Sequence, residues 1–305
     1  MSAIPADDEP KWIYVVRRFT QFLDNLRLTA NQVQDGRTKA IGVVSCLDNA
    51  FYGGPQDESA LLVGSWAKGT AVRPPRDVDL YYRLPLAVHQ RFENYTGNKQ
   101  SALLQEVKRA LQATYHGTSD IRGDGPVVYV GFQTFRVEVV PAFELLSGQF
   151  LICDTKNGGR YKYADPRAEI AHIERADKKN VNNVTALIQM LKAWQAECTV
   201  PLKSFYLELL AAEYVDQSEW RLNNAFWHDW LTRDFFAWLL TKLNHYISVP
   251  GTGELINIGS AWQTRAEMAH TRAIKACEFE RDNLMYSAGD EWQKVFGFQI
   301  PRDVR

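Results

Sequence analysis

Two short groups of residues in this chain could together handle a phosphate and a divalent metal ion. The first group is Gly64-Ser65-Trp66-Ala67-Lys68-Gly69-Thr70, and the second is Asp77-Val78-Asp79. The apolar residues 60–63 predict a short buried strand, so Gly64 and Ser65 would lie where that strand gives way to a helix. Backbone N–H groups at such a turn bind anions, and the helix dipole adds to the attraction. We therefore expect Gly64 and Ser65 to hold a phosphate group.

The two aspartates have the spacing of metal ligands on a strand. The β-branched and aromatic run 78–82 predicts a strand that carries Asp79. Alternate residues of a strand point to the same face, so Asp77 and Asp79 would present their carboxylates together. Because Mg²⁺ prefers oxygen ligands, one ion or a close pair could bridge the two side chains.

Glu138 is the candidate for a third metal ligand. It interrupts the apolar run 135–140, where an outward-facing glutamate on an edge strand is the ordinary alternative. A charge within such a run must face water or bind a cation, and a two-metal mechanism needs another carboxylate beside Asp77 and Asp79. We interpret Glu138 as this ligand, and Glu144 is the competing candidate.

The order of these motifs carries more information than any one of them. Asp-x-Asp alone is common at strand ends, and Gly-Ser is commoner still. A Gly-Ser turn, then Gly-Thr, then Asp-x-Asp, with a strand on both sides, is much rarer by chance. A phosphate-binding turn beside a set of metal-binding acids predicts a nucleotidyltransferase.

Two residues of the second half could face the same phosphates. Lys192 lies within an apolar helical run, where a lysine that extends its ammonium to water is the usual explanation. Ser204 is expected to be the N-cap of the next helix. Across a cleft, the two could also offer an ammonium and a hydroxyl to the β- and γ-phosphates. Lys68 and Arg73 flank the phosphate turn, but loop cations are commonly solvated and we assign them no role.

Composition favours a soluble protein that binds a free nucleotide. The chain has 305 residues, 46% of them apolar, and a formal charge of −1, which does not favour duplex nucleic acid as a partner. Its four cysteines show no metal or disulfide spacing. The start of the chain lacks the regions of a signal peptide, and no apolar stretch is long enough for a membrane span. We expect a cytoplasmic protein with no membrane association.

The pattern along the chain predicts an α+β fold in two lobes, residues 1–165 and 166–305. The first lobe would hold a mixed sheet and a long spine helix at Ala30–Phe51, capped by Thr29. Two strands at residues 127–132 and 135–140 would be joined by a tight link, with Pro141 ending the second, after a polar loop at 117–125. The second lobe would be entirely helical. Its expected helices are 182–196, 204–215, 229–243, 263–286 and 291–296, and others are expected at 12–28 and 101–116.

With these motifs the chain resembles a known family, the bacterial CD-NTases. They are cGAS- and DncV-like cyclic-oligonucleotide synthases of CBASS anti-phage signalling. The family shares Gly-Ser-aromatic-x-x-Gly-Thr followed by Asp-x-Asp. The resemblance runs from about residue 60 to the end. It rests on residues 64–74 and 77–80, the turn 163–166, the segments around Lys192 and 203–208, and the closing segment 292–298.

The resemblance implies a polymerase-β-like nucleotidyltransferase core and a helical nucleotide-binding lobe. It implies that Asp77, Asp79 and Glu138 are catalytic and bind two Mg²⁺ or Mn²⁺ ions, and that Gly64, Ser65, Lys192 and Ser204 bind the nucleotide. One departure is Glu138, where many members have aspartate. No zinc insertion like that of the animal DNA sensor is present, so direct binding of nucleic acid is not expected.

The implied reaction condenses nucleoside triphosphates, ATP with GTP, UTP or CTP, into a cyclic di- or trinucleotide and releases pyrophosphate. CBASS regulatory or effector proteins are the implied partners. Two alternatives stay open: a linear nucleotidyltransferase that acts on RNA, protein or a small molecule, and a catalytically silent binding module. Base choice, ring size and linkage are not fixed by these motifs.

Overall fold

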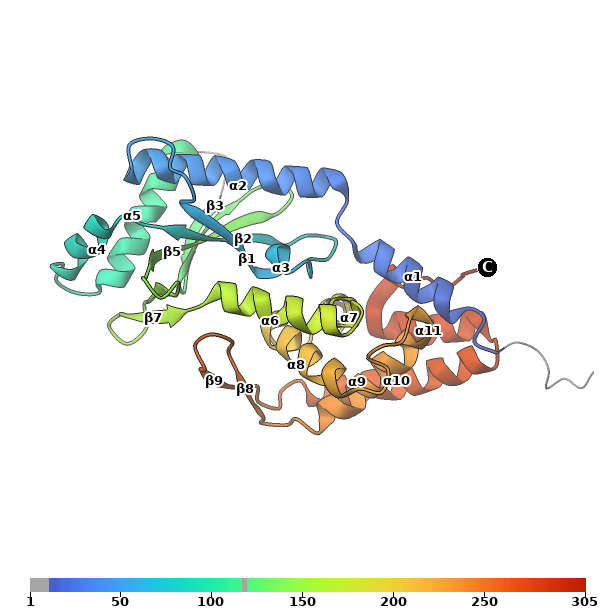
Figure 1. Cartoon of the computed structure of the whole chain (residues 1–305). Coiled ribbons are helices and arrows are strands. Elements are labelled where there is room, and N and C mark those ends of the chain that lie inside the picture. The colour runs from blue at the N-terminus through green and yellow to red at the C-terminus, as the bar shows by residue number, and fades with distance from the viewer. Residues whose placement is uncertain (1–10, 117–119) are drawn as a thin grey trace, which may run out of the picture. The chain divides into compact units, whose positions relative to one another are not determined.

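The computed structural model describes residues 11–116 and 120–305 (Figure 1). Contacts between Cα atoms divide the chain into two compact units, which we call the sheet unit and the helical unit. The sheet unit consists of Leu28–His172 and Val249–Glu254, and the helical unit of the described residues up to Arg27 with Ile173–Ser248 and Leu255–Arg305. These units are discontinuous in sequence, so the predicted lobes 1–165 and 166–305 stay a prediction. The expected absence of a signal peptide falls on residues outside the described part.

The sheet unit is built on a mixed sheet of seven strands. β1 (Ala60–Val63), β2 (Asp77–Arg83), β5 (Arg136–Glu144), β4 (Val127–Gly131) and β3 (Asp120–Asp124) follow one another in space, and β6 (Phe150–Asp154) pairs with β5 and with β7 (Arg160–Ala164). β2 and β5 are parallel, and the other pairs are antiparallel. The central parallel pair places Asp77–Arg83 beside Arg136–Ala142 in register.

Helices cover one face of this sheet. α2 (Ala30–Phe51) runs along it as the predicted spine helix, and it begins with a capping box in which Thr29 and Gln32 satisfy each other's backbone N–H (Figure 1). Val43 and Leu47 of α2, with apolar side chains of α5 (Lys99–Thr114), pack on the buried valines of β4 and β5. The opposite face of β2 and β5 is left to carry polar side chains.

Two expectations for the sheet unit were wrong, and three of its elements were not predicted. β5 does not end at Pro141. Its pairing with β4 extends no further than Val139, and its pairing with β6 starts at Ala142, so the missing N–H of Pro141 faces a gap in the antiparallel pairing. Residues 120–124 of the predicted polar loop form β3, and residues 117–119 lie outside the described part. β6, β7 and the helix α4 (Leu86–Glu93) were not predicted.

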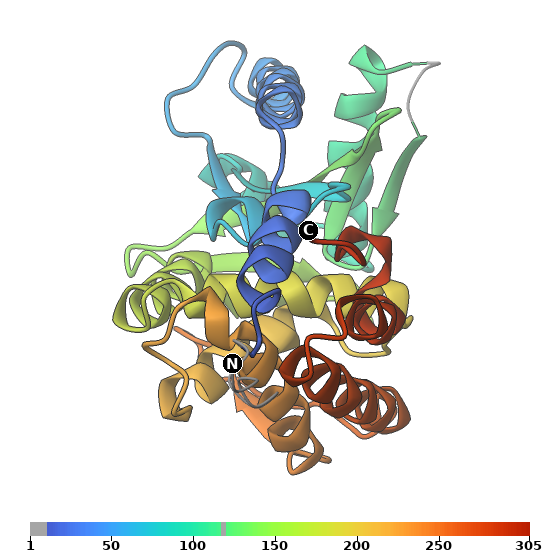
Figure 2. The ribbon, with the colours of Figure 1, turned by 90° about the vertical axis from the view of Figure 1, so that its right-hand side faces the viewer.

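The helical unit contains the expected helices with two corrections. Its helices are α1 (Val15–Leu26), α7 (Asn183–Glu197), α8 (Ser204–Gln217), α9 (His228–Leu240), α10 (Gln263–Arg281) and α11 (Met285–Phe296), and α6 (Pro166–Lys179) runs from the sheet unit into it. The predicted helix 263–286 is two segments, because Asn283 adopts the left-handed conformation (φ 53°) between α10 and α11, which lie side by side (Figure 2). The predicted all-helical lobe also contains a short hairpin, β8 (Tyr246–Ser248) and β9 (Leu255–Asn257).

Within the described part of the chain, no helix combines the length and the apolar composition that a bilayer crossing requires.

Candidate active site

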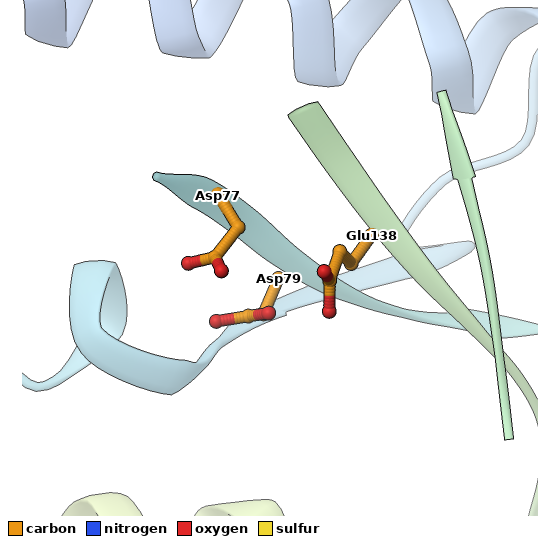
Figure 3. Close-up of side chains that lie close together, drawn as sticks. All are labelled: Asp77, Asp79 and Glu138. Atoms are coloured by element: carbon orange, nitrogen blue, oxygen red, sulfur yellow. The ribbon is translucent and has the colours of Figure 1, made fainter. Parts of the chain in front are cut away.

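Asp77, Asp79 and Glu138 form one cluster at the centre of the sheet (Figure 3). One carboxylate oxygen of each side chain lies within 4.8 Å of those of the other two, and all three residues are partly exposed. Asp79 and Glu138 are direct register partners on the parallel strands β2 and β5. The structure therefore brings together the three acids that the sequence predicted as metal ligands.

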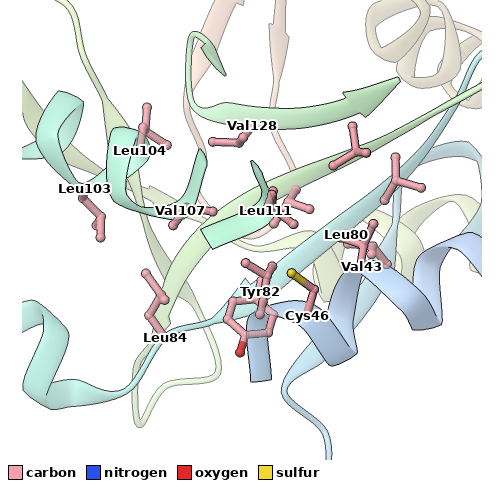
Figure 4. Packing of buried hydrophobic residues seen from close by; sticks show 14 of the residues in the cluster. Val43, Cys46, Leu80, Tyr82, Leu84, Leu103, Leu104, Val107, Leu111 and Val128 are labelled. Carbon is pink, nitrogen blue, oxygen red and sulfur yellow. The ribbon is translucent and has the colours of Figure 1, made fainter. Parts of the chain in front are cut away.

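The strand periodicity explains why the acids face outward. Along β2 the acids alternate with Val78, Leu80 and Tyr82, which are buried in the core against α2 and α5 (Figure 4). On β5, Val137 and Val139 flank Glu138 in the same way and are fully buried. Moving either strand by one residue would bury a carboxylate, so the hydrophobic core fixes the register of the site.

The Gly64 turn lies directly against Asp79. Gly64 has a φ of +62°, and a Cβ added there would come within 2.7 Å of Asp79 Cγ. The Ser65 carbonyl accepts hydrogen bonds from the backbone N–H groups of Thr70 (2.9 Å) and Ala71 (3.1 Å), which closes the loop. α3 (Gly64–Ala67) is a single turn, so a helix dipole would add little to the predicted phosphate binding, which would depend on backbone N–H groups.

Trp66 joins the Gly64 turn to the start of β2, the strand that carries Asp77 and Asp79. Its indole Nε1 donates to the Asp77 carbonyl oxygen at 2.6 Å. Its ring packs so closely on Gly36 of α2 that a Cβ at position 36 would come within 2.8 Å of Trp66 Cζ3. The spine helix, the turn and the start of β2 are therefore held as one assembly.

Lys68 is not the solvated loop cation that the sequence suggested. Its side chain is 3% exposed, and its Nζ lies 3.8 Å from Glu169 Oε2 of α6. The hydroxyl of Tyr81, on the same face of β2 as Asp79, has its pKa raised by burial and by the negative charges of Glu169 and Asp79. The ammonium of Lys68 is therefore buried beside a carboxylate and is not a solvated charge.

Glu144, the competing candidate, has other partners. Its carboxylate binds Arg83 Nη1 at 2.8 Å and Arg167 Nη2 at 2.7 Å. Burial opposes its ionisation, but the hydrogen bonds from Arg83 and Arg167 outweigh burial and hold the pKa of Glu144 below its usual range. Glu144 therefore belongs to a structural ion-pair group at the far end of β5.

Sequence reasoning missed Arg136, which lies two residues before Glu138 on the same face of β5. Its Nε is 2.7 Å from Glu138 Oε1, and its Nη2 is 3.9 Å from Asp77 Oδ2. The only available signal was the Arg-x-Glu spacing on a predicted strand, which places both side chains on one face.

Lys192 and Ser204 belong to the helical unit. Lys192 on α7 is buried, and its Nζ pairs with Glu208 Oε1 of α8 at 2.7 Å, so it does not extend to water. Ser204 is not the N-cap of α8, since Lys203 holds that position; the Ser204 hydroxyl donates to Gln195 Oε1 at 2.7 Å. Their predicted contacts with a nucleotide stay predictions.

The three acids fit a hard divalent cation. Carboxylate oxygens are the donors that Mg²⁺ and Mn²⁺ prefer, and the missing Cβ of Gly64 leaves room beside the Asp79 carboxylate. A parallel strand pair with three acids on one face, next to a Gly-Ser turn, defines a nucleotidyltransferase of the polymerase-β-like fold.

Comparison with known proteins agrees with this class. Residues 14–180, more than half of the chain, match the family described as Second Messenger Oligonucleotide or Dinucleotide Synthetase domain (SMODS). A probable cyclic nucleotide synthase of Bacillus cereus (strain VD146) is 25% identical over 175 residues, which is 54% of this chain and 51% of the relative. The chain thus matches about half of the length of that relative.

Solved structures of the same family share the fold over nearly the whole chain. The structure of Vibrio cholerae DncV cyclic AMP-GMP synthase with a linear intermediate has a TM-score of 0.73 at 12% identity, and covers 96% of this chain and 97% of that one. CdnC of Escherichia coli MS115-1 with ATP has a TM-score of 0.68 at 18% identity, and covers 95% and 99%. The Bradyrhizobium diazoefficiens CD-NTase CdnG with GTP has a TM-score of 0.65 at 13% identity, and covers 96% of each chain.

The chain belongs to the SMODS family, that is, to the CD-NTases. The resemblance drawn from the sequence and the predicted α+β fold are both confirmed.

Proposed function

We propose that this protein condenses nucleoside triphosphates into a cyclic di- or trinucleotide and releases pyrophosphate. The cyclic product would serve as a second messenger in anti-phage (CBASS) signalling. The observation that carries the proposal is the cluster of Asp77, Asp79 and Glu138 beside the Gly64 turn. Family membership supports it, because the family is that of second messenger oligonucleotide or dinucleotide synthetases.

The three carboxylates would hold Mg²⁺, or Mn²⁺ in its place. Two such ions, when bound, lower the pKa of an attacking ribose hydroxyl and stabilise the departing pyrophosphate. The chain itself supplies position: the Gly64 turn brings backbone N–H groups to the triphosphate, and Trp66 fixes that turn to the strand of the acids. Positioning and charge neutralisation are most of what phosphoryl transfer requires.

Lys192 and Ser204 remain our proposed triphosphate contacts, on the resemblance to the family alone. The ion pair of Lys192 with Glu208 would hold its ammonium in place, and Gln195 would orient the Ser204 hydroxyl. Gly64 and Ser65 are the proposed contacts from the sheet unit.

Related structures support the proposed ligands and partners. CdnC is known with ATP and in a complex with a HORMA protein, and CdnG with GTP. We propose ATP with a second nucleoside triphosphate as substrates, and a CBASS regulatory or effector protein as partner. We place the reaction in the cytoplasm, where these triphosphates are made and where free cysteines such as Cys46 and Cys153 stay reduced.

The proposal is tested by incubating the protein with Mg²⁺ and each pair of labelled triphosphates. A product that resists phosphatase and has the mass of a ring supports it. A product that phosphatase degrades would favour a linear nucleotidyltransferase instead. The Asp77→Ala/Asp79→Ala variant should fold and release no pyrophosphate, and retained turnover would contradict the assignment of the site.

A further inference from the structure

Arg136 is a cation in direct contact with the proposed metal ligands. It faces Asp77 across the β2–β5 pair, and its guanidinium lies 2.7 Å from Glu138 Oε1 and 3.9 Å from Asp77 Oδ2. Its side chain is 45% exposed, so water and ions can reach it. The positive charge of Arg136 therefore lies among the three acids of the cluster.

The neighbouring strand holds this arginine in place. The register partner of Arg136 on β4 is Gly131, which has no side chain, and the guanidinium instead lies 5.2 Å from the ring centre of Tyr129. Tyr129 is the register partner of Glu138, and its hydroxyl donates to Asp120 on β3 at 3.4 Å. Contact with a carboxylate on one side and an aromatic ring on the other limits the rotamers that Arg136 can adopt.

The positive charge of Arg136 affects how strongly the three acids bind a divalent cation. Negative charges on three carboxylates within 4.8 Å of one another repel, and the guanidinium of Arg136 offsets part of that repulsion. A divalent cation that binds the same oxygens is repelled by the guanidinium charge. It must also replace Arg136 as the ion-pair partner of Glu138. A metal ion that arrives bound to a triphosphate forms part of a negatively charged complex, so the guanidinium opposes its binding less.

We propose that Arg136 is a positioning residue that acts as a built-in counter-ion: it holds Glu138 in the metal-free site and weakens binding of a divalent cation until a nucleotide is present. This inference rests on the proposed function, in that the acids must bind a metal. A purely structural role for Arg136 predicts the opposite effect on metal affinity, because loss of the guanidinium would then leave Glu138 misplaced.

The test measures Mn²⁺ binding without nucleotide, by electron paramagnetic resonance of free Mn²⁺ at low salt. Arg136→Gln should tighten binding by about three- to tenfold, the effect of removing one nearby charge from a partly solvated site. Arg136→Lys keeps the charge and should stay within about twofold of the natural protein. Addition of a non-hydrolysable triphosphate should reduce the difference between Arg136→Gln and the natural protein.

Arg122→Gln is the matched control. Arg122 on β3 is the register partner of Tyr129 on β4, so it lies on the same face of the sheet as the cluster. It pairs with Asp120 at 2.7 Å and not with the cluster. This variant should leave Mn²⁺ affinity unchanged, and thermal unfolding in EDTA checks that every variant is folded.

The outcomes separate the two proposals. If the natural protein shows no saturable Mn²⁺ binding, the metal site of the proposed function fails. If the natural protein binds Mn²⁺ but Arg136→Gln binds it equally or more weakly, or Arg136→Lys behaves like Arg136→Gln, the counter-ion role of Arg136 is overturned and the metal site stands.

Discussion

Asp79 and Glu138 are register partners on neighbouring parallel strands, so the fold and not their spacing in the sequence makes them neighbours. Parallel strands need a crossover connection, and here it contains α4, α5 and the β3–β4 hairpin. The core beneath the pair, with Leu80 and Val139 both buried, keeps the two carboxylates on one face. The third acid of the site therefore depends on correct packing of the whole sheet unit.

Glu138→Gln should reduce pyrophosphate release by about 100-fold or more, because a neutral amide binds a divalent cation far less well than a carboxylate. Glu138→Asp should keep a measurable part of the activity, since aspartate still offers a carboxylate to the ion. Initial rates of pyrophosphate release at saturating Mg²⁺ measure both. Equal losses in the two variants would show that side-chain length, and not charge, limits the site.

Gly64→Ala should abolish activity and lower the free energy of unfolding. The added Cβ would overlap the Asp79 carboxylate, and a residue with a side chain at φ +62° costs about 1–2 kcal/mol by itself. Gly53→Ala is the matched control, because Gly53 has φ +78° but an added Cβ meets no atom within 4 Å. Denaturant unfolding should show a loss of stability in both variants that is larger in Gly64→Ala, and pyrophosphate release should be lost in Gly64→Ala alone. An active Gly64→Ala variant would contradict the tight approach of this turn to Asp79.

Local sequence signals predicted the elements that depend on local interactions. α2 was predicted at its observed bounds, because Thr29 is a good N-cap residue and Gly53 follows the end of the helix. Local sequence signals did not predict the end of a strand where its pairing with neighbouring strands decides its length. Pro141 looked like the end of β5, but only the positions of β4 and β6 reveal that no N–H is needed there.

The same distinction applies to the candidate site. Residue type and alternation were enough to predict Asp77, Asp79 and Glu138, whose proximity is confirmed. Lys68 looked like a solvated loop residue because the sequence cannot show Glu169 of α6 beside it. Arg136 was missed because its role depends on a register partner, Asp77, on another strand.

Lys192→Met should destabilise the helical unit by about 3–5 kcal/mol, because it leaves the buried Glu208 carboxylate without its ammonium partner. The double variant Lys192→Met/Glu208→Leu should recover most of this loss, since two apolar side chains can replace a buried ion pair. Denaturant unfolding measures the stability, and nucleotide binding measures the proposed role of Lys192. A double variant with natural stability but weak triphosphate binding would support that role, and unchanged binding would remove Lys192 from the site.

Two adjacent buried groups on α9, His228 and Asp229, should give the helical unit opposing pH dependences. The side chain of Asn183 donates to the Arg221 and Asn223 carbonyls, so its oxygen faces His228 and must accept from His228 Nε2 at 3.0 Å. His228 Nδ1 is buried and has no partner among the described residues, so a second proton there is unfavourable. Burial lowers the pKa of His228 to about 4.

The neighbouring carboxyl is affected in the opposite direction. Burial raises the pKa of Asp229 to about 7, although the Trp230 N–H donates to one carboxylate oxygen at 2.8 Å. The negative charge of Glu280 adds to the rise, and Arg233 opposes it. The folded protein therefore keeps a proton on Asp229 in a range where the unfolded chain has lost it.

The signs follow from which state binds more protons. Between pH 4 and 6.5 the unfolded chain protonates His228 but the folded protein does not, so His228 makes stability rise with pH. Between the ordinary aspartate pKa of 3.8 and about 7, the folded protein holds the Asp229 proton, so Asp229 makes stability fall as pH rises. Each slope is about 1.4 kcal/mol per pH unit, and the two nearly cancel in the natural protein.

Removing either group should expose the slope of the other. Relative to the natural protein, Asp229→Asn should gain stability with rising pH up to about 7, and His228→Gln should lose stability with rising pH between 4 and 6.5. His228→Gln keeps an N–H that can donate to Asn183, and Asp229→Asn keeps an oxygen that can accept from Trp230, so neither change removes the observed hydrogen bond. Urea unfolding followed by tryptophan fluorescence at several pH values from 4.5 to 8 measures both differences. Parallel curves for the two variants would contradict the assigned protonation states, because only opposite shifts in pKa give slopes of opposite sign.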